Sequence, residues 1–177
     1  MALFLGSYAN KVDRKGRVSV PAQFRAALAG QVFNGIVAFP SFKEPAIEAF
    51  SESDMARLAE SLEQLDQFSQ EREDLSLIFA DSLQIGFDGE GRVVLPQAFA
   101  DHAGITDTAL FVSAVDHFQI WSPDTYARKK NGARERLQSR GATLRVRPSG
   151  SFNGPGSNGP GFSGPGSPTG AGPTGAR

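Results

Sequence analysis

Short runs of apolar or alternating residues, separated by glycine and proline, occur twice along the chain in the same order. The first set is GSYANKV, RVSV, GIVAFP and AIEAFS, and the second set is LQIGF, RVVL, LFVSAV and FQIWS. A proline follows the second run of each set, at Pro21 and Pro96. Proline ends a strand because it lacks a backbone N–H, and it suits the first position of a helix. Each half is therefore expected to form a strand, a tight loop, a strand, a short helix and two further strands.

Between the two halves, apolar residues recur at three- and four-residue spacing, which is typical of one face of a helix. These residues are Met55, Leu58, Leu62 and Leu65, followed after a break near Ser69 by Leu75, Ile78 and Phe79. Ser51, with Asp54 three residues later, is a capping signal. We expect linking helices here. Packing within the chain is the first interpretation of their apolar face, and contact with a neighbouring subunit is the second.

The last thirty residues have a different composition. They begin PSGSFNGPGSNGPG at residue 148 and repeat Gly-Pro-Gly every five residues, which is not the three-residue period of collagen. Because this segment has almost no apolar surface to offset its backbone entropy, we expect it to be disordered. The expected organisation is a first repeat at 7–54, linking helices at 55–82, a second repeat at 83–126, a basic helix at 127–147 and a tail at 148–177.

A nine-residue motif marks the tight loop of each half. The sequence DRKGRVSVP at 13–21 recurs as DGEGRVVLP at 88–96. Each copy is interpreted as a hairpin with a three-residue loop, whose glycine takes the left-handed conformation. The charges facing each other across such a loop contribute about 0.2–1 kcal/mol, so they fix the shape of the loop more than they stabilise the fold. The expected loop clamps are Asp13, Gly16 and Arg17 in the first copy, and Asp88, Gly91 and Arg92 in the second.

The two loops differ in the charge at their tips. The first loop carries Arg14 and Lys15, whereas the second carries Gly89 and Glu90. Arginine can bind a phosphate or the edge of a guanine through two hydrogen bonds, and lysine adds a point charge. A glutamate at the same place would repel phosphate. We therefore expect the first loop to bind DNA and the second loop to have a structural role only. The predicted DNA-binding residues are Lys11, Arg14, Lys15 and Arg17.

The net charge of −1 does not by itself suggest a nucleic-acid partner, but the distribution is uneven. Between Lys11 and Arg25 there are five basic residues and one acid, whereas residues 44–74 hold ten acids and two arginines. Such a chain can present one positive and one negative face. The predicted helix at 127–147 is again basic. Its cations are interpreted first as a solvated surface and second as an additional DNA contact.

Composition excludes several classes of protein. The chain has no cysteine, so disulfides and thiolate metal sites are not available. The apolar N-terminal run is too short for a signal peptide, and no run approaches the ~18 apolar residues of a membrane span. We expect a soluble cytoplasmic protein, without a membrane partner, that associates with the nucleoid.

Two other functions compete with DNA binding. In a hydrolase, Asp13 and Asp88 could share one proton as an aspartic dyad. However, each has its own arginine at a fixed spacing, which favours two separate ionised carboxylates. His102 and His117 have neither a nucleophile to serve nor acidic partners at metal-ligand spacing. We therefore expect no enzyme activity, metal, cofactor or small-molecule substrate, and the remaining alternative is a non-enzymatic scaffold that binds protein.

The two halves, GSYANKVDRKGRVSVPAQFRAAL and FDGEGRVVLPQAFADHAGI followed by FQIWS, resemble the MraZ family of bacterial transcriptional regulators. The resemblance covers about residues 1–140 and implies two AbrB-like repeats, each marked by Asp-x-x-x-Arg, here Asp13 to Arg17 and Asp88 to Arg92. It implies a mainly β fold with helices (α+β), in which the two halves form one swapped-hairpin β-barrel with accessory helices. It also implies a homo-oligomeric ring that binds double-stranded DNA at repeats upstream of the division and cell-wall gene cluster.

Overall fold

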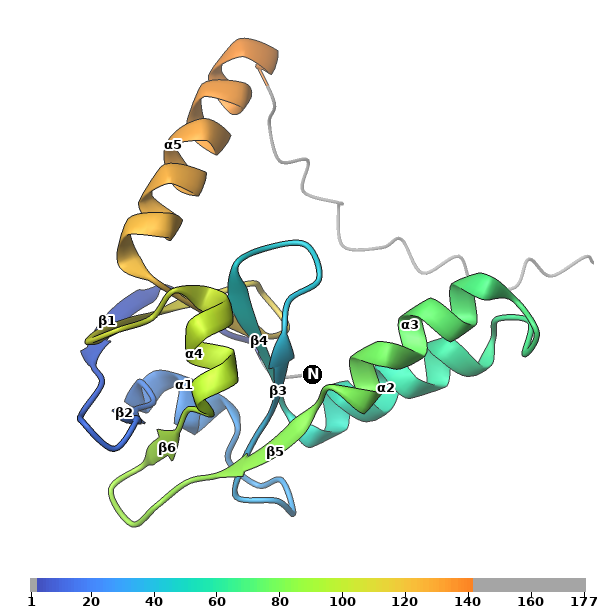
Figure 1. Cartoon of the computed structure of the whole chain (residues 1–177), viewed down its shortest axis with the longest axis horizontal. Helices are drawn as coiled ribbons and strands as arrows, with labels where there is room; N and C mark the ends of the chain where they lie inside the picture. Colours follow the sequence, from blue (N-terminus) through green and yellow to red (C-terminus); the bar gives the residue numbers. More distant parts are fainter. Residues whose placement is uncertain (1–2, 142–177) are drawn as a thin grey trace, which may run out of the picture. The chain divides into compact units, whose positions relative to one another are not determined.

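The computed structural model describes residues 3–141, and the two halves of this region contain the same succession of elements (Figure 1). The first half consists of β1 (Ser7–Lys11), β2 (Arg17–Ser19), α1 (Ala22–Ala27), β3 (Gly35–Pro40) and β4 (Ala46–Phe50). The second consists of β5 (Leu83–Gly86), β6 (Arg92–Val94), α4 (Gln97–Ala103), β7 (Thr108–Ser113) and β8 (Phe118–Trp121). Helices α2 (Glu52–Glu63) and α3 (Gln70–Ala80) connect the halves, and α5 (Pro123–Arg140) follows them. The expected combination of β-strands with accessory helices is confirmed, but helices hold more residues than strands, so the fold is mixed α and β rather than mainly β.

The two halves exchange strands. Six strands form one antiparallel sheet in the order β1-β7-β8-β4-β3-β5, and β2 and β6 form a second, two-stranded sheet. The first strand of each half therefore pairs with the third strand of the other half, β1 with β7 and β5 with β3. Neither half can complete its sheet alone. The larger sheet is not closed into a barrel, since β1 and β5 form its two edges.

The short strands around each tight loop diverge instead of continuing as a two-stranded hairpin. Strands β1 and β2 meet only at one isolated bridge, between Val12 and Val18. Beyond that point β2 pairs with β6, and Val18 lies opposite Val93. Both valines are almost fully buried. The exchange is favoured because it places an apolar side chain from each half in the shared core, which a local hairpin would not do.

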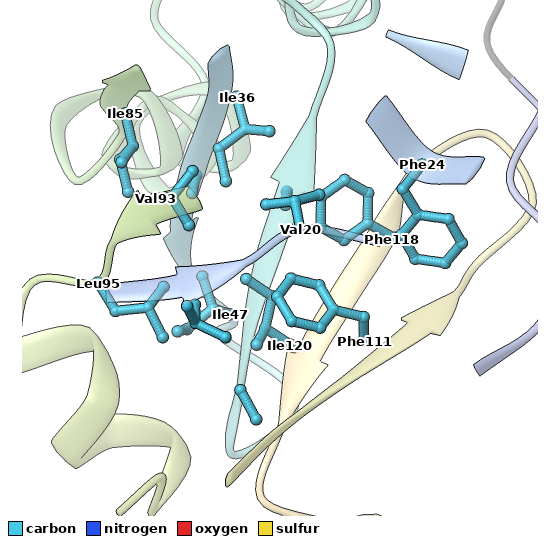
Figure 2. Close-up of a cluster of buried hydrophobic side chains, with 14 of the residues drawn as sticks. Val20, Phe24, Ile36, Ile47, Ile85, Val93, Leu95, Phe111, Phe118 and Ile120 are labelled. Atoms are coloured by element: carbon cyan, nitrogen blue, oxygen red, sulfur yellow. The ribbon is translucent and has the colours of Figure 1, made fainter. Parts of the chain in front are cut away.

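The core is built from both halves. Figure 2 shows Phe24 and Val20 from the first half packed with Phe111, Phe118 and Ile120 from the second. The rings of Phe24 and Phe118 are 5.0 Å apart between centroids. Burying one such side chain contributes about 1.5–3 kcal/mol. Because these contacts cross between the halves, the core holds the two repeats together as one unit.

The first linking helix begins at the predicted capping residue, Ser51, and the second begins after Ser69, near which a break was predicted. The Ser51 side chain accepts a hydrogen bond from the backbone N–H of Asp54, and Ser69 caps α3 in the same way through Arg72. Met55 is buried against β3 and β4. Part of the apolar face of α2 therefore packs within the chain, as expected, while the remainder lines an open groove between the two helices.

Helix α5 begins at Pro123, with Ser122 at its N-cap and Pro123 in its first position, so it extends four residues before the basic segment that starts at 127. Its first turns pack on β7 and on Trp121 of β8. The Tyr126 ring contacts Trp121, and the Lys129 ammonium lies 4.7 Å from the centre of the indole. Lys129 also forms an ion pair with Glu44. The expected tail at 148–177 and the last residues of the expected basic helix, 142–147, lie outside the described residues.

Candidate nucleic-acid interface

The first loop is organised around the carboxylate of Asp13. One carboxylate oxygen accepts the backbone N–H groups of Lys15 and Arg17, each at 2.9 Å. The other oxygen accepts the Nε–H of Arg17 at 2.6 Å. Gly16 has φ of 75°, the left-handed conformation that a side chain would disfavour. The pKa of Asp13 lies below its ordinary value, chiefly because its carboxylate accepts the backbone N–H of Arg17. Partial desolvation opposes this shift, and the hydrogen bond from the Arg17 guanidinium adds to it.

The second loop repeats this geometry. The Asp88 carboxylate accepts the backbone N–H groups of Glu90 and Arg92 at 2.9 Å and the Nε–H of Arg92 at 2.7 Å. Gly91 has φ of 72°. The backbone and side-chain hydrogen bonds from Arg92 lower the pKa of Asp88 to about 2. Arg92 makes a second ion pair, with Glu90 at 2.6 Å, and the hydrogen bond to Asp88 raises its own pKa.

The two tips differ in the number of cationic side chains that form no ion pair. In the second loop both acids bind Arg92, so its charge is fully matched. In the first loop Asp13 binds Arg17, but Arg14 and Lys15 are exposed and form no ion pair among residues 3–141. Lys11, the last residue of β1, is also exposed. The first tip therefore presents to solvent two cationic side chains that are paired with no acidic side chain in the described residues, which is the arrangement an anionic ligand requires.

Each loop is also fixed by the half of the chain to which it does not belong. The Gly16 carbonyl accepts the N–H of Leu95 at 2.9 Å, and the Gly91 carbonyl accepts the N–H of Val20 at 3.1 Å. A Cβ atom on Gly16 would come within 3.2 Å of the Leu95 carbonyl oxygen. These bonds follow from the β2–β6 pairing, which local sequence reasoning did not anticipate. The first tip is therefore positioned by the second repeat.

Arg25 braces the second loop, a role that the sequence reading missed. Its Nε–H donates to the Val20 carbonyl at 3.1 Å, and its guanidinium lies against Gly91, where a Cβ atom would come within 2.5 Å. The available signal was an asymmetry between the repeats. Arg25 stands four residues after Pro21, and the position four residues after Pro96 is Ala100.

The remaining titratable residues give little support to a catalytic or metal site. Asp13 and Asp88 each have a lowered pKa, whereas a dyad that shares a proton needs one raised carboxyl pKa. The ring of His102 bonds to the backbone carbonyls of Ser41 and Glu44. Among residues 3–141 there is no cluster of three side chains able to hold a metal ion.

His117 has two acidic hydrogen-bond partners that sequence reasoning did not identify. Its Nε2 lies 3.1 Å from Glu48, sixty-nine residues away in the sequence, and its Nδ1 lies 2.8 Å from Asp116. Burial opposes protonation of the ring, but the hydrogen bonds to Glu48 and Asp116 outweigh it and raise the pKa of His117 above 6.5. The two carboxylates bind opposite nitrogens of one ring, so they do not converge on a common metal position.

Comparison with known proteins agrees with the duplicated fold. The family described as "MraZ protein, putative antitoxin-like" matches residues 3–75 and 78–143, one segment for each repeat. In the part of the chain that the structure describes, no helix is both long and apolar enough to cross a membrane.

Relatives with assigned names match most of the chain. The transcriptional regulator MraZ of Rickettsia felis (strain ATCC VR-1525 / URRWXCal2) is 42% identical over 146 residues, which are 82% of this chain and 98% of the relative. The protein of the same name from Rickettsia canadensis (strain McKiel) is 43% identical over the same shares. That from Rickettsia bellii (strain OSU 85-389) is 42% identical over 147 residues, again 82% of this chain and 98% of the relative. With both repeats matched and two aspartate–arginine loops in place, the chain belongs to the MraZ family.

Proposed function

We propose that this protein is a DNA-binding transcriptional regulator that contacts double-stranded DNA through its first loop. The observation that carries the proposal is the difference between two loops of the same shape. One presents Arg14 and Lys15 without acidic partners, and the other matches its single arginine with two acids. The relatives' name, transcriptional regulator, supports the same function.

Each cation of the first loop has a distinct role in this proposal. Arg14 can donate two parallel hydrogen bonds to a phosphate or to the O6 and N7 atoms of guanine, so it is the candidate for base recognition. Lys15 and Lys11 supply point charges to neighbouring phosphates. Arg17 is held by Asp13, so it contributes positive charge at the neck and keeps the tip in one conformation. A pre-formed loop loses less conformational entropy on binding DNA.

Assembly completes the proposed mechanism. One loop offers too small a contact for tight and selective binding, because even whole recognition modules have modest interfaces. Repeating the loop around a homo-oligomeric ring raises the effective concentration of each further contact, provided that the spacing of DNA repeats matches the spacing of loops. Repeats upstream of the division and cell-wall gene cluster are the proposed target. In this function the protein acts in the cytoplasm at the nucleoid, without a cofactor or catalysis.

A binding titration against the DNA upstream of the chain's own gene tests this function. We expect specific binding. The logarithm of the association constant should fall linearly with the logarithm of the salt concentration, with a slope of about −0.9 for each phosphate contacted. A shuffled duplex of equal length is the control. Equal affinity for both duplexes, or binding that does not respond to salt, would contradict the proposal.

A further inference from the structure

An apolar groove lies open between α2 and α3, which run side by side (Figure 1). The groove has a volume of about 270 Å³. Apolar side chains form most of its lining: Leu58, Leu62, Leu65, Leu75, Ile78 and Phe79. Leu58 and Leu75 are 38% and 40% exposed, although both belong to the apolar face that should be covered in an amphipathic helix. A cluster of this kind on a hairpin is typical of an interaction surface.

The surroundings of the groove are strongly acidic. Residues 52–81 contain nine acids and two arginines. Both arginines make contacts within the hairpin, and two arginines do not balance nine acids. Arg57 is paired with Asp54, and the Arg72 guanidinium donates to the carbonyls of Leu62 and Leu65 at the end of α2. An occupant of this groove must therefore combine an apolar centre with positive charge.

The outer half of α5 has this combination. Residues 134–140 are all exposed, and Leu137 has 55% of its surface in solvent. Positions three and four residues apart share one face of a helix, so Leu137 lies beside Ala133 with cations on both sides. The cations of this face are Lys130, Arg134 and Arg140. None of them forms an ion pair among residues 3–141.

We infer that the α2–α3 groove binds the outer half of α5 from a second copy of this chain. Leu137 and Ala133 would enter the groove, and the flanking cations would meet the acids of the hairpin. The alternative in which two hairpins pack on each other would bring two surfaces of excess negative charge together, which is costly. Within one chain, α5 packs on β7 and Trp121 and leaves its outer half unused.

This contact is head to tail, because the groove and the helix are different surfaces of the same molecule. Every copy then offers one groove and one helix, and such contacts produce a ring when the rotation between neighbours closes. The inference rests on the homo-oligomeric part of the proposed function and specifies its interface.

Two exposed leucines allow a complementation experiment. We expect Leu75→Asp to destroy the groove and Leu137→Asp to destroy the helix surface, so that each variant alone sediments as a monomer. In an equimolar mixture, the intact helix of the first variant meets the intact groove of the second. The mixture should therefore form a dimer and nothing larger. Leu77→Asp, on α3 but outside the groove lining and 52% exposed, is the matched control and should assemble as the wild type does.

Light scattering on gel-filtered samples distinguishes the outcomes, and circular dichroism melting checks that each variant is folded. Retention of the wild-type mass by either variant, or a mixture that stays monomeric, would overturn the inference. A wild-type protein that is itself a monomer would overturn both the inference and the ring. The DNA function is tested separately, because a Leu137→Asp monomer keeps its first loop and should still bind DNA weakly and in a salt-dependent manner. A double variant, Arg14→Ala with Lys15→Ala, should assemble normally.

Discussion

The two loops have the same conformation and differ in the charge of the side chains at their tips. In both, an aspartate accepts two backbone N–H groups and the Nε–H of an arginine four residues later. The tips then diverge, since the first holds Arg14 and Lys15 and the second holds Glu90, which binds the arginine of its own loop. Because the aspartate–arginine pair is the same in both loops, its role is to fix the conformation of the loop. The charge placed on that shape is a separate feature, and the proposed DNA binding depends on it.

The loops are nevertheless not independent, because strands β2 and β6 join them. Each loop glycine accepts a hydrogen bond from the opposite repeat, and Arg25 of the first repeat lies against Gly91 of the second loop. The second tip, which carries no unpaired cation, therefore has a structural use. The second loop supports the first, in the way that a rigid scaffold holds a binding loop.

The largest expected effect comes from Arg17→Ala. This change removes a cation beside the DNA and also releases Asp13, whose carboxylate would then add an uncompensated negative charge at the neck. We expect the affinity for specific DNA to fall roughly 100-fold, since each 1.4 kcal/mol corresponds to a tenfold change. The fold should survive, because the clamp is half-exposed and the core is untouched. Fluorescence anisotropy measures the DNA affinity, and a melting curve measures the stability of the fold. An unchanged affinity would contradict the proposed difference between the loops.

Smaller losses are expected when the tip residues are changed singly. Arg14→Ala and Lys15→Ala should each weaken binding by about tenfold at low salt and reduce the steepness of the salt dependence by about 0.9 for one lost phosphate contact. Arg14→Ala should in addition relax the preference for one base in the repeat, whereas Lys15→Ala should not. Titrations against duplexes with single base changes distinguish these roles. Identical base preferences in both variants would show that Arg14 contacts phosphate alone.

The second clamp should affect stability before it affects binding. Arg92→Ala leaves both Asp88 and Glu90 without their partner. We expect the melting temperature to fall by about 2–4 °C. Because the β2–β6 pairing carries the disturbance to the first loop, a loss of DNA affinity of only a few-fold should accompany it. If Arg92→Ala abolishes binding while the melting temperature is unchanged, the roles of the two loops are reversed.

Much of this architecture could be predicted from local patterns. The repeated motif indicated both loops and their left-handed glycines, and Ser51 indicated the start of α2. What could not be predicted depends on which distant segments meet. The β2–β6 pairing, the contact of Arg25 with Gly91 and the bond between His117 and Glu48 each join residues more than sixty positions apart. Alternation along a strand specifies its buried face but not the identity of its partner.

The smallest expected effect is a titration at acid pH. A lowered pKa means that the ionised Asp88 stabilises the folded state above pH 3.8, and that this contribution is lost as the pH falls through about 2. We expect the carbon resonance of the Asp88 carboxyl group to titrate with a midpoint near this value in the wild type. In Arg92→Ala the midpoint should move upward towards the ordinary value of 3.8. An unchanged midpoint would mean that the backbone N–H groups alone hold the carboxylate.

Exchanging the two tips tests most directly whether tip charge decides DNA binding. In one variant Arg14→Gly and Lys15→Glu give the first loop the charge of the second. In the other, Gly89→Arg and Glu90→Lys do the reverse, and Gly89 tolerates a side chain because no atom lies within 4 Å of its Cβ position. Salt-dependent titration against the upstream DNA should show that the first variant loses specific binding while its melting temperature is retained. The second variant should keep specific binding through its unaltered first tip. Specific binding that persists in the first variant, with an undiminished salt dependence, would contradict the account.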